Sequence, residues 1–150
     1  MGERMSGAAA VGTSAGTGRR YVAAVIDGLL ALGCALAMAT GYVLTRDSMP
    51  GGPGPNAPGL GISFAAGLFG WSFLNHVPLT VATRASAGKA LAGIRVVRAT
   101  DGGRPRPHQA LLRWLGGLAW GLVVLPAAYV LGGSDADPQD FAGLRLTRPE

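Results

Sequence analysis

Charge is scarce in this 150-residue sequence, which is 14% charged and 49% hydrophobic. An ordinary soluble domain has about 25% charged residues. No Asp, Glu, Lys or Arg occurs in three long stretches, 28–45, 48–83 and 114–134. A soluble domain cannot cover its surface with so few charges, and so apolar a chain is not intrinsically disordered as a whole. We therefore interpret the chain as a membrane protein.

Cysteine is nearly absent as well, since Cys34 is the only one. A lone cysteine excludes an internal disulfide and a cysteine metal cluster, so we assign Cys34 to packing. The sequence also has no metal-ligand pair at helical spacing, no Ser/His pair in matched spans and no phosphate-cradling loop. We therefore expect no enzymatic activity, no cofactor and no metal.

Three windows are long and apolar enough to cross a membrane as helices. A hydrocarbon core of about 30 Å requires about 20 mostly apolar residues, and the windows are 21–44, 60–83 and 110–132. They predict an all-α membrane protein with about three transmembrane helices. A complete third crossing would place the C-terminal tail outside, whereas Pro126 leaves open a shallow re-entrant hairpin that returns the tail to the cytoplasm.

The remaining segments differ from the windows in composition. Residues 1–18 are rich in Gly, Ala, Ser and Thr and predict a disordered arm. Residues 49–59 contain four prolines and predict a stiff extended turn rather than helix. The membrane domain is accordingly expected to occupy 19–146, with 147–150 as the end of the tail.

Basic residues close to the ends of the spans predict orientation. The arm holds Arg4, Arg19 and Arg20, and the first loop only Arg46. The second loop holds Arg84, Lys89, Arg95, Arg98, Arg104 and Arg106. We expect a multi-pass protein of the cell membrane with its N-terminus and this basic loop in the cytoplasm, where the loop meets anionic lipid headgroups. The net charge of +5 does not indicate nucleic acid, because aromatic residues do not alternate with the basic ones.

Asp27 is an ionisable residue inside a predicted span, which is costly and points to function. It follows Arg20 by two helical turns, so both side chains project from one face about 10 Å apart. His76, beside Asn75, lies at a similar depth in the second span. We hypothesise a polar cluster of these residues and Arg113, with Arg20 at its rim, that relays protons or holds a cation. The alternative is that they only bond the helices together.

Small residues recur every four positions, a spacing that lets helices approach closely. They are Gly33, Ala37 and Gly41, then Ala66 and Gly70, then Gly117 and Gly121. The pattern predicts close packing within the chain or between copies of it.

Two blocks of the sequence resemble the RDD family of integral membrane proteins, named for one arginine and two aspartates. The first block runs from Arg20, where the family's arginine starts the first span, to Asp27. The second contains the pairs Gly88-Lys89 and Gly93-Ile-Arg95, then a turn at 101–103 and Arg113 at the start of the last span. The resemblance covers about 19–146 and implies a bacterial inner-membrane protein.

The family's second aspartate precedes an Ala-Gly-Thr. Asp140 is the nearest equivalent, but its spacing is one residue shorter and Leu144 replaces the threonine. For the family, transport of unidentified ligands has been proposed, and cation/proton exchange for some members. Asp140 therefore differs from Arg20 and Asp27 in matching the family pattern only in part.

Two functions remain open on the sequence. The first is transport-related: Asp27 and its neighbours bind or relay H⁺ or a small cation or solute, with a homo-oligomer or a second membrane subunit completing the path. The second is a structural or accessory membrane protein that assembles with or anchors a partner. Within the basic loop, a short amphipathic element at the interface, a helix from Ala85 or a hairpin, is as consistent as a plain loop.

Overall fold

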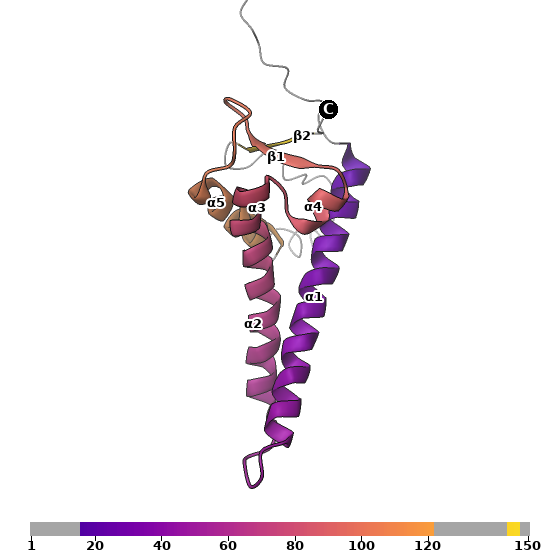
Figure 1. Ribbon diagram of the computed structural model, residues 1–150, viewed down its shortest axis with the longest axis vertical. Helices are drawn as coiled ribbons and strands as arrows, with labels where there is room; N and C mark the ends of the chain where they lie inside the picture. The colour runs from indigo at the N-terminus through magenta and orange to yellow at the C-terminus, as the bar shows by residue number, and fades with distance from the viewer. Residues whose placement is uncertain (1–15, 122–143, 148–150) are drawn as a thin grey trace, which may run out of the picture.

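The structure is a computed structural model that describes residues 16–121 and 144–147. Two long helices form an antiparallel hairpin, and the shorter elements gather at the end where the first helix begins (Figure 1). The elements are α1 (Thr17–Asp47), α2 (Ala57–His76), α3 (Pro78–Thr83), α4 (Ala87–Leu91), β1 (Arg95–Arg98), α5 (Pro107–Ala119) and β2 (Leu144–Thr147). We call residues 28–74 the shaft, and residues 16–27, 75–121 and 144–147 the head.

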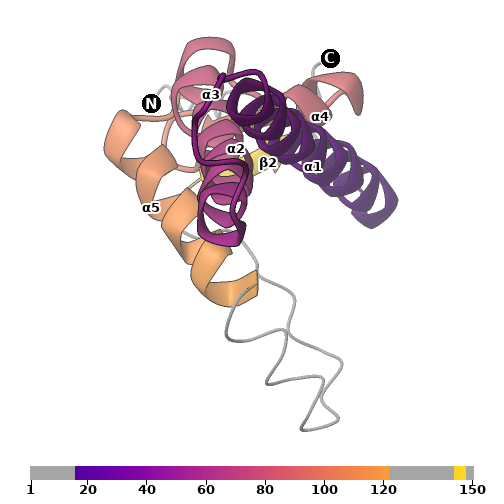
Figure 2. The same ribbon diagram turned by 90° about the horizontal axis from the view of Figure 1, so that it is seen from below.

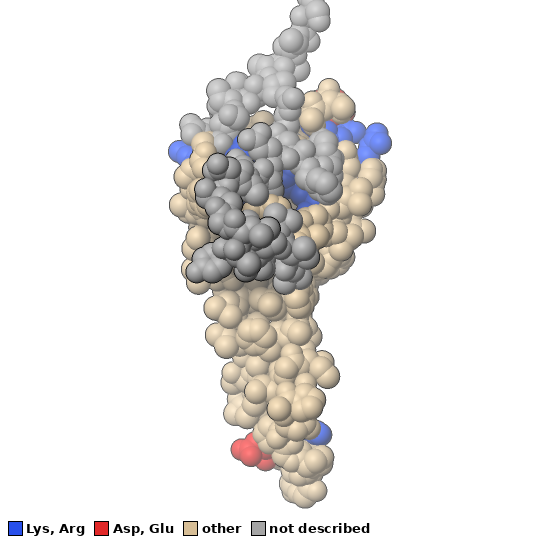
Figure 3. Space-filling model, turned by 180° about the vertical axis from the view of Figure 1, so that it is seen from behind, with Lys and Arg blue, Asp and Glu red and all other residues tan. Residues whose placement is uncertain are grey.

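Two of the predicted spans are helical in the structure. By length and composition, α1 and the α2–α3 segment Ala57–Thr83 can each cross a membrane. On the face shown in Figure 3, the shaft is free of charged side chains except near its tip, whereas Lys and Arg lie on the head. The membrane interpretation therefore agrees with the shape and the charge distribution of the described residues.

The turn between the long helices agrees with the predicted stiff loop except at its end. Gly51, with φ +69°, lies in the turn after α1. Asn56 then caps α2 by accepting a 2.8 Å hydrogen bond from Gly59 N. The helix begins at Ala57 and includes Pro58, because a proline in the first turn removes an N–H that has no partner within the helix.

One row of α1 is buried along the head and the shaft. It consists of every fourth residue, namely Ala23 and Asp27 in the head and Ala31, Ala35 and Ala39 in the shaft. Opposite them on α2, a Cβ on Gly67 would lie 2.6 Å from the Cys34 carbonyl oxygen and 2.7 Å from Ala35 Cα. The two backbones therefore touch at a place where only glycine fits.

The predicted rows of small residues are not this packing face. A Cβ added to Gly33, Gly41 or Gly70 meets nothing within 4 Å. Because Gly33 is two positions from both Ala31 and Ala35, it points to the other side of α1. Within one chain the packing face is therefore a different row from the predicted ones, and packing of the predicted rows between copies of the chain stays a prediction.

The all-α prediction is wrong in the head, where β1 and β2 form a two-stranded antiparallel sheet. The sheet pairs Val96 with Leu146 and Arg98 with Leu144. Its buried side chains form a small core with the start of α1, made of Ala23, Ile94, Val96, Leu144 and Leu146. The basic loop is thus a short helix followed by a strand, and the partner strand comes from the C-terminal end rather than from a local hairpin.

The predicted third span, 110–132, is described only as far as residue 121. Its described part, α5, lies across the axis of the hairpin, as the view along that axis shows (Figure 2). Both α5 and β2 lie in the head, at the same end of the hairpin. A single complete crossing would separate the two by about 30 Å. The pairing therefore agrees with the alternative in which the tail returns to the side of the basic loop.

Candidate functional site

The carboxylate of Asp27 is the centre of the polar site in the head. Its side chain is only 6% exposed. Oδ1 accepts hydrogen bonds of 2.7 Å from Asn75 Nδ2 and 2.7 Å from Gly88 N, and Oδ2 accepts one of 2.6 Å from Ser86 Oγ. One side chain of α1 thereby binds the end of α2 and the start of α4.

Asn75 extends these contacts to a second backbone group. Its Nδ2 donates to Asp27, while its Oδ1 accepts a 2.7 Å hydrogen bond from Ala87 N. At 2% exposed it is buried, and an unpaired amide at such a position costs about 1–3 kcal/mol. Asn75 therefore links the carboxylate to the first turn of α4.

Two glycines of the predicted loop motif have backbone roles. A Cβ on Gly88 would overlap the carbonyl oxygen of Ala23 and lie 2.8 Å from Asp27 Cγ, so α4 approaches α1 only because this residue is glycine. Gly93, with φ +66°, ends α4. There Gly93 N donates to Ala90 O at 3.2 Å and Ile94 N to Lys89 O at 2.8 Å, as in a Schellman motif.

His76 lies next to the carboxylate but is not hydrogen-bonded to it. Its Nδ1 is 3.0 Å from the Ser72 carbonyl oxygen. Because a carbonyl only accepts, Nδ1 must carry the proton of that bond. In the neutral ring Nε2 is then an acceptor, and it lies 3.7 Å from Asp27 Oδ2. Only a protonated ring would make this contact an ion pair.

Lys89 brings an ammonium to the same place. Its Nζ donates a 3.1 Å hydrogen bond to Ser86 Oγ, the hydroxyl that binds Asp27. Burial and, to a smaller extent, the positive charge of Arg113 lower the pKa of Lys89 to about 8, against the opposing effect of Asp27. Two cationic side chains, Lys89 from α4 and Arg113 from α5, therefore lie close enough in the head to repel each other.

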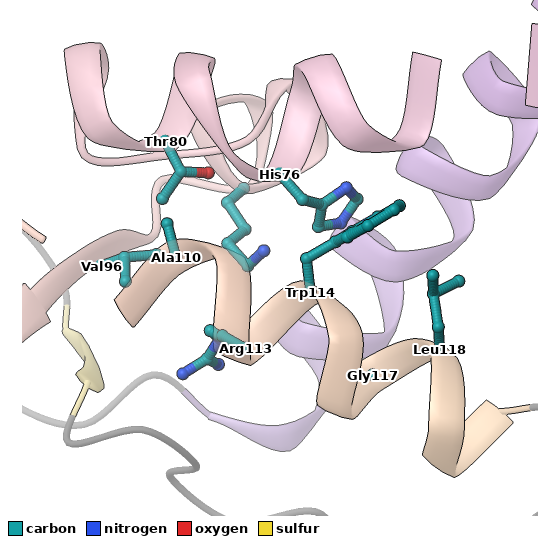
Figure 4. Close-up of a pocket in the computed structure, with 9 residues that line it drawn as sticks. His76, Thr80, Val96, Ala110, Arg113, Trp114, Gly117 and Leu118 are labelled. Atoms are coloured by element: carbon teal, nitrogen blue, oxygen red, sulfur yellow. The ribbon is translucent and has the colours of Figure 1, made fainter. Parts of the chain in front are cut away.

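A cavity of about 210 Å³ separates α5 from α2 and α4 (Figure 4). It is lined by His76, Thr80, Lys89, Val96, Ala110, Arg113, Trp114, Gly117 and Leu118. Trp114 is fixed in its wall by a 3.0 Å hydrogen bond from Nε1 to Ser72 Oγ and by an edge-on contact with Phe73, at 5.3 Å between ring centroids.

A second cavity, of about 100 Å³, lies on the side of α1. Arg20, Asp27, His76 and Lys89 line it, together with residues of the small core. His76 and Lys89 border both cavities. The polar site therefore lies between two cavities. One is lined in part by residues of α1, and the other in part by residues of α5.

The structure places most of the predicted site residues together. Asp27 is in contact with both Asn75 and His76, Arg113 lines the larger cavity together with His76, and Arg20 borders the smaller one. Gly88 and Lys89, predicted only through the family resemblance, join the same site. Arg95 does not, since it is exposed on β1.

The sequence analysis did not identify Ser86 as a site residue. The feature that could have indicated it is its position directly before a helix, where serine is favoured. Asp140 lies outside the described residues. In the parts that are described, no three His, Cys, Asp or Glu side chains are grouped so as to hold a metal ion.

Comparison with known proteins gives one match. The chain matches the family model of the RDD family over residues 14–141, which is most of its length. Comparisons with curated proteins and with solved structures gave no significant match.

Proposed function

This chain belongs to the RDD family, whose members are membrane proteins, and on that premise we propose that it works as an accessory protein of the cell membrane. The shaft anchors it in the bilayer, and Asp27 holds the head rigid. The head presents its basic residues to anionic lipid headgroups or to a partner. No catalytic step and no cofactor belong to this proposal.

The observation that carries the proposal is that three donors from two other helices bind the Asp27 carboxylate. An ionised carboxylate has about four acceptor positions, and Asn75, Ser86 and Gly88 occupy three of them. A group that moves protons or cations needs acceptor positions that exchange between partners. A carboxylate bound from three places is better suited to holding α1, α2 and α4 in one arrangement.

The charge distribution supports an anchor with its head in the cytoplasm. Apart from the pair Arg46 and Asp47 near the tip, residues 28–83 contain no Asp, Glu, Lys or Arg. The basic residues of the N-terminal arm and of the second loop flank the other end of both long helices. Because such residues are retained on the cytoplasmic side, the head is proposed to face the cytoplasm and the tip the outside.

The outer faces of the shaft offer a surface for assembly. Large apolar side chains are exposed along α1, among them Leu29, Leu32 and Leu36. Lipid covers such a surface, and so does another membrane helix. The proposal includes a homo-oligomer or a partner membrane subunit along this face.

Transport of H⁺ or a small cation is the second candidate, and one observation favours it. His76 borders both cavities and lies 3.7 Å from Asp27 Oδ2. In this alternative, the imidazole binds a proton from one cavity and releases it to the other through the neighbouring carboxylate, which stabilises the protonated ring. In this alternative Asp27 changes its charge in every cycle, whereas in the accessory role it never does.

Asp27→Asn separates the two candidates, because the amide keeps one oxygen acceptor for Asn75 and Gly88 but does not titrate. Proton and sodium flux would be measured in proteoliposomes with wild type, with Asp27→Asn and with Asp47→Asn as a matched control at the other end of α1. The accessory role predicts no protein-dependent flux in any of the three. Flux in wild type and in Asp47→Asn that disappears in a folded Asp27→Asn would establish transport instead.

Co-sedimentation with vesicles tests the accessory role itself. In this assay, protein in nonionic detergent is mixed with vesicles containing phosphatidylglycerol or phosphatidylcholine alone. We expect the head to favour the anionic vesicles and the preference to weaken as salt screens the charges. Equal binding to both vesicles at low salt would contradict the proposal.

A further inference from the structure

The larger cavity is bordered by two cationic side chains from different helices. Lys89 lines it from α4 and Arg113 from α5, and His76 of α2 lines it too. Lys89 and Arg113 repel each other, which contributes to the lowered pKa of the lysine. Like charges brought to one partly buried place are stabilised by an anion bound between them.

The rest of the lining is mostly apolar. Val96 of β1 contributes to it, and so do Ala110, Trp114 and Leu118 of α5, the helix that also carries Arg113 (Figure 4). An anion surrounded by water gains nothing from such a lining. A molecule with an anionic group next to hydrocarbon fits the cationic and the apolar side chains at once, and the indole of Trp114 is an aromatic ring of the kind found at the membrane interface.

The volume is sufficient for such a group. The cavity measures about 210 Å³, and an apolar protein cavity of about 150 Å³ holds a benzene molecule. A phosphate group with the first part of a lipid backbone has the size and the polarity that this space requires.

We propose that the cavity between α2, α4 and α5 is a binding site for a phosphate-bearing anion, with Lys89 and Arg113 on the phosphate and Trp114 and Leu118 on the adjoining hydrocarbon. The phosphate comes from a lipid headgroup or from free phosphate, and the apolar lining favours the lipid. This site deepens the proposed function, because it gives the basic head a specific place for an anionic lipid. It does not depend on whether Asp27 also moves protons.

The site would be tested by equilibrium binding in nonionic detergent, read by the fluorescence of Trp114. Trp71 and Trp120 are replaced by phenylalanine so that Trp114 alone reports. The probes are a short-chain phosphatidylglycerol, a short-chain phosphatidylcholine and inorganic phosphate. We expect a saturable fluorescence change with phosphatidylglycerol. Its dissociation constant should be at least tenfold lower than that for phosphatidylcholine.

Lys89→Gln should weaken the binding of phosphatidylglycerol by about ten- to a hundredfold, as expected for losing a hydrogen bond to a charged group. Arg95→Gln is the matched control, because it removes the same charge from the exposed strand β1 and should change the affinity little. Equal weakening by both variants would show a diffuse surface effect and overturn the site. Inorganic phosphate that binds as tightly as the lipid would confirm the phosphate site and assign it to the free ion.

The wild type provides a test that needs no charge-removing variant. The groups that face Lys89 are Asp27, His76, Arg113 and Arg20, and their types ordinarily titrate outside the range from about pH 7.5 to 10. Affinity for phosphatidylglycerol should therefore fall across this range as Lys89 loses its proton, and Lys89→Arg should remove the fall. No saturable binding of either phosphate probe at neutral pH would overturn the site, while leaving the Asp27 contacts and the vesicle preference as separate results.

Discussion

The shaft and the head are held together by different forces. In the shaft, α1 and α2 pack through alanines and the close approach at Gly67, and these contacts are apolar. In the head, three hydrogen bonds to one carboxylate and a small two-stranded sheet do the same work. Packing of small residues brings the two backbones close together, whereas hydrogen bonds to a carboxylate also require particular donors at particular positions.

Both regions use the same row of α1. Ala23, Asp27, Ala31 and Ala35 follow each other at four-residue spacing on one buried face. At position 27 a carboxylate stands in this row of alanines. There α1 contacts the other helices through hydrogen bonds, and at the alanines it contacts α2 through apolar packing. The carboxylate thereby helps to define the register of the hairpin at its end in the head.

The largest effect is expected from Asp27→Leu. This variant leaves the donors of Asn75, Ser86 and Gly88 without an acceptor, at about 1–3 kcal/mol for each buried donor. Thermal unfolding in detergent, followed by circular dichroism, should show a strong decrease in stability, and Asp27→Asn should recover most of it. If Asp27→Leu unfolds like the wild type, the head is not held by this carboxylate.

Gly88→Ala and Gly67→Ala should each cost about 1–3 kcal/mol, because each adds a Cβ where another backbone already lies. The two variants should destabilise different regions, Gly88→Ala the head and Gly67→Ala the shaft. Lys89 is the only lysine, so its rate of acylation by an amine reagent reports on α4, and only Gly88→Ala should raise that rate. Gly70→Ala is the control, since its Cβ meets nothing within 4 Å. Equal rates in both variants would mean that head and shaft do not move separately.

A smaller effect is expected from the titration of Lys89. Its pKa of about 8 lies below the ordinary 10.5, so between these values the unfolded chain holds a proton that the folded chain has lost. The free energy of unfolding should therefore rise with pH across this range. Carbon-13 NMR of the reductively methylated lysine measures the pKa directly, and Lys89→Met should flatten the stability profile. A lysine that titrates near 10.5 would show that the head does not bury it.

The smallest effect is expected from Asp101→Asn. The ion pair between Arg98 and Asp101, at 2.8 Å, is on the surface of the head, and Asp101 is half exposed. Such pairs contribute about 0–1 kcal/mol. The melting temperature in detergent should stay within about 2 °C of wild type, and a larger loss would mean that the turn after β1 is coupled to the site.

The sequence predicted how deep the site residues lie along the helices better than it predicted which of them contact each other. Counting helical rise from the basic residues placed His76 level with Asp27, and the two are in contact. It did not show that Asn75 is the residue bonded to the carboxylate, because adjacent residues differ by about 100° around a helix. The rotation of α2 follows from packing within the chain, which uses a different row of small residues from the predicted ones.

Contacts between distant segments were beyond what the pattern shows. Ser86 and Gly88 reach Asp27 across 59 and 61 residues. The strand β2 has only four residues, too few for alternation to distinguish it from a loop. Its partner β1 lies in a segment that was interpreted as a helix, a hairpin or a plain loop, so neither the sheet nor the return of the chain to the head could be deduced.

The pairing of β1 with β2 has a consequence for biosynthesis. Leu144 and Leu146 complete the small core beneath Ile94 and Val96, so this core cannot form until the ribosome has made the last described strand. Both long helices are synthesised well before that point, and the hairpin can enter the bilayer while the sheet still lacks its second strand. A nascent chain that stops before residue 144 would expose Ile94 and Val96 at the membrane surface, where quality-control proteases recognise apolar segments.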